Sequence, residues 1–151
     1  MAHPTWMVKL KVYQELNGYR NVPRCEDYDF ILRAMAHGYK VGNIPKVELS
    51  YRIRQSGISK SNEAEQFLMR DYLAHNMKQI DSITEESITK FLNSEGFHRR
   101  LGQLSHYKDE KLIIKNATGI KKFITITKIL KNRFFWKDIV EKITLLLRER
   151  V

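Results

Sequence analysis

Apolar positions follow a helical period at the start of the chain. Apolar side chains recur every three or four positions over residues 10 to 16 and again over 26 to 37, which predicts two short helices. Asn17-Gly18 and Gly38 supply the expected stops. The predicted core-facing residues are Leu10, Tyr13 and Leu16 in the first helix, and Tyr28, Ile31, Leu32 and Met35 in the second.

The period changes to that of strands after residue 38. Residues 39 to 44 are predicted to form a short strand, and after Pro45 apolar and polar residues alternate strictly as far as residue 54. A strand over 47 to 54 would place Arg52 and Arg54 together on its polar face. The first part of the chain is therefore predicted to be mixed α/β.

From about residue 61 the pattern is helical throughout. A helix is predicted from Ser61-Asn62 to about residue 80, and Ser82-Ile83-Thr84-Glu85 fits a capping box that begins a short helix to Leu92. Further helices are predicted near 108–116, 120–131 and 135–149, separated by glycines at 96, 102 and 119. The core positions expected in the first of these helices are Ala64, Leu68, Met69, Leu73, Met77 and Ile80. We predict a boundary near residue 60, with a mixed α/β part at 1–60 and an all-helical region at 61–151.

Composition adds a charge argument. The net charge of +10 favours an anionic partner, although it also suits a protein that is merely basic. Cys25 is the single cysteine, so the chain cannot form an internal disulfide, and a reducing, cytoplasmic setting is favoured. The beginning of the chain does not have the pattern of a signal peptide. The apolar stretch 143–147 is far shorter than the ~20 residues of a spanning helix.

Two groups of charged residues could carry chemistry. Glu26 and Asp27 open a predicted helix, where the helix dipole keeps a carboxylate ionised, so they could accept a proton or simply cap the helix. Arg52 and Arg54 could grip a diphosphate through forked hydrogen bonds, or form a solvated strand face.

The order of four short segments resembles a known family. His3-Pro4-Thr5, Asn17-Gly18-Tyr19-Arg20, Glu26-Asp27-Tyr28-Asp29 and Tyr51-Arg52-Ile53-Arg54 resemble, in order and spacing, the acceptor half of a family-two glycosyltransferase with the GT-A fold. The resemblance covers roughly residues 3 to 62. It implies a partial GT-A half with a few strands, followed by the helical C-terminal region.

The resemblance also implies functions for individual residues. Asp27 would be the general base with Glu26 as its neighbour, while Asp29 and Arg33 would be structural. His3 and Thr5 would lie beside the acceptor. Arg52, Arg54 and Ser59 would contact the diphosphate; the family often has histidine where this chain has Arg54, so no metal ligand is assigned.

The implied reaction is an inverting transfer of a sugar from a nucleotide-diphosphate sugar to a hydroxyl. The acceptor would be a glycan or a lipid-linked molecule, and the setting bacterial cell-surface polysaccharide synthesis at the cytoplasmic face of the membrane. A divalent metal, Mg or Mn, is expected in the complete enzyme. The sequence shows no Asp-x-Asp motif, no βαβ series before His3 and no Gly-rich phosphate loop, so the chain is expected to be inactive without a donor-binding half.

Two other readings follow from the basic composition. Residues 120–151 are rich in lysine and arginine around Phe134-Phe135-Trp136, which suits either an anionic membrane surface or a packed helix pair with a solvated basic face. The net positive charge of the whole chain would also suit a nucleic-acid-binding module, which is the alternative function. Nucleic acid is the less favoured partner, because the basic residues are dispersed and no nucleic-acid-binding motif occurs.

Overall fold

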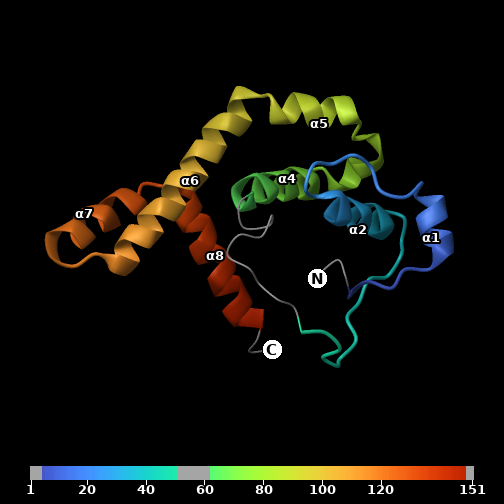
Figure 1. The fold of residues 1–151 in the computed structure, drawn as a ribbon, viewed down its shortest axis with the longest axis horizontal. Coiled ribbons are helices and arrows are strands. Elements are labelled where there is room, and N and C mark those ends of the chain that lie inside the picture. The colour runs from blue at the N-terminus through green and yellow to red at the C-terminus, as the bar shows by residue number, and fades with distance from the viewer. Residues whose placement is uncertain (1–4, 51–61, 149–151) are drawn as a thin grey trace. The chain divides into compact units, whose positions relative to one another are not determined.

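The fold is seen in a computed structural model that describes residues 5–50 and 62–148 (Figure 1). The chain divides into two compact units, Met1–Ser94 and Glu95–Val151. The boundary predicted near residue 60 falls outside the described residues.

Every regular element in the described residues is helical, so the predicted mixed α/β, partial GT-A fold is wrong for this chain. Residues 39–50, where strands were predicted, form neither a helix nor a strand, and the side chains of residues 40–50 are exposed. An alternating sequence becomes a strand when a neighbouring strand pairs with it. The described residues supply no such neighbour, and the predicted strand end at 51–54 lies outside them.

The first unit is built from short helices that lie where the period predicted them. Helix α2 packs against α4 and the 3-10 helix η2, as Figure 1 shows. Thr84 caps α5: its hydroxyl accepts from the amide of Ser87, whose own hydroxyl accepts from the amide of Thr84, so the capping box begins two residues later than predicted. The elements are α1 (Leu10–Glu15), α2 (Glu26–Ala36), α4 (Glu63–His75), η2 (Met77–Ser82) and α5 (Glu85–Leu92).

The core of this unit forms two clusters. The larger joins α2, α4, η2 and α5, and the smaller lies between α1 and α2. Of the apolar positions predicted in the first helix, Leu16 is buried, whereas Leu10 and Tyr13 are exposed and Val12 is buried in their place. The larger cluster contains Val22, Cys25, Leu32, Met69, Leu73, Ile80, Ile83 and Ile88; the smaller contains Val12, Leu16, Phe30 and Ala34.

The second unit contains three helices, α6 (Glu95–Asn116), α7 (Gly119–Ile129) and α8 (Arg133–Arg148), and both α7 and α8 contact α6. Helix α6 begins at Glu95, beside the break predicted at Gly96, and continues through Gly102, where another break was predicted. A glycine inside a helix costs about 1 kcal/mol relative to alanine, which the burial of Phe97, Leu104 and Tyr107 along the same helix can offset. No helix in the described residues is long and apolar enough to span a membrane.

Candidate functional site

A buried ion-pair network fixes the middle of α2. The carboxylate of Asp29 is fully buried and accepts a 2.9 Å hydrogen bond from Nε of Arg33, one turn later. Arg33 also donates to the carbonyl oxygens of Leu16 and Gly18 at 2.6 and 2.7 Å. Asp29 and Arg33 pair as their spacing of one helical turn allows, and the bonds from Arg33 tie α2 to the segment that follows α1.

Arg20 completes this network, and sequence reasoning assigned it no function. Its Nε donates to Asp29 at 3.1 Å, and its Nη1 donates to the carbonyl oxygens of Ile80 and Ile83 at 3.0 and 2.8 Å. These carbonyls are at least 60 residues away, so no local pattern could reveal the contact. Its place in the Asn17-Gly18-Tyr19-Arg20 segment was the one available signal.

The turn before Arg20 places Tyr19 against α2. Asn17 and Gly18 have φ angles of 54° and 67°, and a Cβ at Gly18 would lie 2.9 Å from the hydroxyl of Tyr13. The positive φ angle therefore favours glycine at residue 18, and a side chain there would also displace the exposed ring of Tyr13. The turn brings the ring of Tyr19 within 5.2 Å, centroid to centroid, of the Phe30 ring.

The acidic pair lies in the first turn of α2, beside Tyr19. Glu26 is exposed and Asp27 is half-buried, and the amide of Tyr28 donates to Oδ1 of Asp27 at 2.7 Å. Burial raises the pKa of Tyr19, and the nearby charges of Tyr13, Asp27 and Glu26 raise it further. Within the described residues neither acidic side chain forms an ion pair, in contrast to Asp29.

Cys25 immediately precedes this pair and is not suited to be a nucleophile. The thiol is buried, 3.6 Å from the carbonyl oxygen of Gln66. Burial raises its pKa to about 12, although the Arg70 guanidinium acts in the opposite direction. A thiol with this pKa is protonated at neutral pH and is a poor nucleophile.

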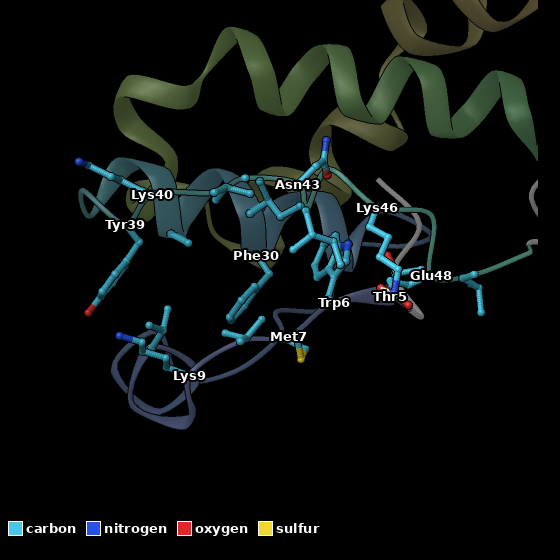
Figure 2. A pocket seen from close by; sticks show the side chains of 18 of the residues that line it. Thr5, Trp6, Met7, Lys9, Phe30, Tyr39, Lys40, Asn43, Lys46 and Glu48 are labelled. Carbon is cyan, nitrogen blue, oxygen red and sulfur yellow. Dashed lines mark ion pairs between the residues drawn. The ribbon is translucent and has the colours of Figure 1, made fainter.

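An open groove lies between the segment before α1, helix α2 and residues 39–49 (Figure 2). Trp6 and Phe30 supply aromatic surface, and Lys46 forms a 2.9 Å ion pair with Glu48 at one side. The remaining lining residues include Thr5, Lys9, Ile31, Ala34, Tyr39 and Lys40.

Asp27 lies one helical turn from this groove. Phe30, Ile31 and Ala34 line it from α2, and they follow Asp27 by three, four and seven residues. This spacing places Asp27 on the same helix face, about 5–6 Å along the axis from Phe30 and Ile31. The Tyr19 ring contacts Phe30, and the charge of Asp27 helps to raise the pKa of its hydroxyl.

Of the other predicted site residues, one lines the groove and the rest lie outside the described residues. Thr5 is exposed and lines the groove. His3, Arg52, Arg54 and Ser59 lie outside the described residues. Among residues 5–50 and 62–148, no group of three or more His, Cys, Asp or Glu side chains could hold a metal ion. The described residues thus offer no site for Mg or Mn, and we derive no step through a metal.

Comparison with known proteins finds a partial similarity to a glycosyltransferase. No known family and no solved structure matches the chain. A 52-residue part of it is 41% identical to an uncharacterized glycosyltransferase of Methanocaldococcus jannaschii. The chain is similar to a glycosyltransferase. The match covers 34% of this chain and 18% of that protein. This similarity supports a glycosyltransferase-related family and a transferase-like role, and it names no substrate or pathway.

Proposed function

We propose that the chain corresponds to the C-terminal, acceptor-binding half of an inverting glycosyltransferase. In this proposal Asp27 removes the proton from an acceptor hydroxyl bound in the groove. The observation that carries the proposal is the position of Asp27, half-buried and unpaired among the described residues, one turn from an aromatic groove.

The three carboxylates in the first turn of α2 differ in what they can do. Asp29 is buried between two guanidinium groups, so its oxygens are occupied and inaccessible to an acceptor. Glu26 is exposed to solvent. Asp27 lies in the first turn of α2, half-buried and without an ion pair in the described residues, so its carboxylate is available to accept a proton.

The groove would bind the acceptor. Sugar rings pack well on aromatic side chains, and the half-buried Trp6 offers such surface above the buried Phe30. Thr5 and His3 are proposed to contact the acceptor, a glycan or a lipid-linked molecule. Lys9 and Lys40 at the groove would favour an acceptor that carries negative charge.

The donor would be a nucleotide-diphosphate sugar. Arg52, Arg54 and Ser59 remain our candidates for contact with its diphosphate. The match covers 18% of its relative, so we assign nucleotide binding to a further segment or a partner subunit. We propose that the reaction takes place on the cytoplasmic side of the cell membrane and serves polysaccharide synthesis.

The proposed reaction is a single displacement. The acceptor oxygen attacks the anomeric carbon, a new carbon–oxygen bond forms, and the bond to the diphosphate breaks with its electrons leaving on the nucleoside diphosphate. The acceptor proton passes to the carboxylate of Asp27. One displacement inverts the configuration of the anomeric carbon.

The test is nucleoside-diphosphate release by the complete protein product of the locus, screened with a panel of nucleotide sugars and hydroxyl acceptors. We expect acceptor-dependent release with one donor, and inversion in the product by NMR. Asp27→Asn is expected to lower the rate by a factor of about 10²–10⁴, the usual contribution of a general base, at unchanged donor affinity.

Two matched variants serve as controls. Glu26→Gln removes a neighbouring, more exposed carboxylate and is expected to cost much less rate than Asp27→Asn. Asp109→Asn removes an exposed carboxylate on α6 and is expected to leave the rate unchanged. Equal effects of the Asp27 and Asp109 variants, or no donor consumed from the panel, would contradict the proposed function.

A further inference from the structure

Helix α7 presents an exposed apolar face. Ile120, Phe123 and Ile124 keep 79%, 69% and 49% of their surface exposed. Thr127 lies among them at helical spacing and is also exposed. We call these four residues the α7 face. Large apolar side chains grouped in this way mark an interaction surface.

The α7 face is opposite to the side on which α7 is held. Thr125 and Ile129 are buried, and α7 contacts α6. With about 3.6 residues per turn, positions 120, 123, 124 and 127 point away from positions 125 and 129. The helix is therefore anchored through one edge while its more apolar side faces outward.

Lysines border this face and no carboxylate offsets them. The segment 119–132 contains no acidic residue. Its four lysines are exposed, and none of them forms an ion pair with a described residue. Lys121 and Lys128 lie along one side of the α7 face, Lys122 lies nearer the buried Ile129, and Lys131 follows the end of the helix.

We propose that the α7 face docks on an anionic phospholipid bilayer, with Ile120, Phe123 and Ile124 entering the interface. An apolar stripe bordered by Lys121 and Lys128 along one side, with Lys131 just past its end, complements a surface whose interior is apolar and whose headgroups are negative. Trp136 is 54% exposed and its indole N–H donates to the carbonyl of Leu130 at 2.9 Å, which places an amphipathic ring near the end of α7. This inference does not rest on the proposed glycosyl transfer.

The first test is co-sedimentation of the full chain with vesicles. We expect binding to mixed phosphatidylglycerol–phosphatidylcholine vesicles, weaker binding at high salt, and little binding to pure phosphatidylcholine. The double variant Ile120→Ser/Phe123→Ser should lose at least about tenfold in affinity. Its matched control, Leu112→Ser/Ile113→Ser, changes exposed apolar residues of α6 and should bind like the wild type.

Charge is tested separately. Lys121→Gln and Lys128→Gln should each weaken binding about fivefold, the usual effect of one cation near an anionic surface. Lys90→Gln, an exposed lysine of α5, should have no effect. Circular dichroism of each variant excludes unfolding as the cause of lost binding.

A fluorescent label reports insertion directly. Cys25 is buried and unreactive, so Thr127→Cys can be labelled selectively in the α7 face, and Ser105→Cys on α6 serves as the control. We expect a blue shift with anionic vesicles for the first position and none for the second. No binding to anionic vesicles would overturn the proposal. So would a shift that appears without vesicles as protein concentration rises, since the face would then join two copies of the chain.

Discussion

Asp27 and Asp29 are two positions apart on α2, yet their surroundings differ completely. Asp29 is buried and bonded to Arg20 and Arg33, whereas Asp27 is half-buried without an ion pair in the described residues. Burying a carboxylate costs free energy because the charge loses its hydration. The two guanidinium partners of Asp29 offset this cost, so removing either side of the network is destabilising. This division makes Asp29 a structural residue and leaves Asp27 available for chemistry.

The division predicts a large loss of stability for Asp29→Asn. The variant leaves two guanidinium groups without their shared counter-charge, one of them buried, so we expect a loss of about 3–5 kcal/mol in the free energy of unfolding. Urea denaturation followed by circular dichroism measures it. Asp109→Asn, on the exposed surface of α6, should change this free energy by less than about 0.5 kcal/mol. Two variants of equal stability would mean that the network does not hold α2.

Cys25 gives a second prediction at this scale. With its pKa raised to about 12, the thiol should react with a disulfide reagent at neutral pH at least about a thousandfold more slowly in the native chain than in urea. The absorbance of the released thiolate follows the reaction. Rapid modification of the native chain would show that the Cys25 thiol is accessible and would contradict the predicted low reactivity.

In this region the sequence could predict contacts within one helix but not contacts between distant segments. The Asp29–Arg33 pair could be predicted because the residues are one helical turn apart. The bonds from Arg20 to the carbonyls of Ile80 and Ile83 could not, because they depend on how distant helices pack. The same limit explains α1, where local spacing did not reveal that Val12 would be the residue facing α2.

At the scale of elements, helices were predicted well because their period is local. Strands were predicted at 39–44 and, from alternation, at 47–54, but the described part of that stretch has no pairing neighbour and forms no strand. A helix satisfies its own backbone groups, whereas a strand needs a second strand. Among the glycines only Gly102 misled, since α6 continues through it, whereas Gly96 and Gly119 lie beside helix starts.

The attachment of α8 to α6 is predicted to depend on pH. Asp138 on α8 accepts hydrogen bonds from the hydroxyl of Tyr107 at 2.7 Å and from Nζ of Lys111 at 2.9 Å, both on α6. The bonds from Lys111 and Tyr107 lower the pKa of Asp138 to about 2. In an unfolded chain the group would titrate near about 3.9, so the stabilisation is complete above that pH and is lost as pH falls through about 4 to 2.

Asp138→Asn tests this contact. We expect the variant to lose about 1–2 kcal/mol at neutral pH and to show a weaker dependence of unfolding on pH between about 4 and 2. Thermal unfolding across this pH range measures both effects. The exposed Glu141→Gln change on the same helix is the control, and an identical pH dependence of wild type and Asp138→Asn would contradict the assignment.

At the scale of the whole molecule, the chain combines two compact units with different proposed tasks. The first carries the groove and Asp27, and the second carries the α7 face. The similarity to a glycosyltransferase covers about a third of the chain, so it supports the transferase reading without describing the remaining two thirds. Sequence reasoning suggested both tasks, while the groove and the outward orientation of the α7 face required the structure.

The most direct test of the account is a paired measurement on Asp27→Asn in the complete protein: the rate of acceptor-dependent nucleoside-diphosphate release and the midpoint of unfolding. The account predicts that the rate falls by at least about a hundredfold while the midpoint stays within about 2 °C of the wild type, because Asp27 bonds to no other element in the described residues. Transfer that survives the substitution would show that Asp27 is a helix-terminal residue without a catalytic function. Loss of rate and stability together would show that it acts through the fold.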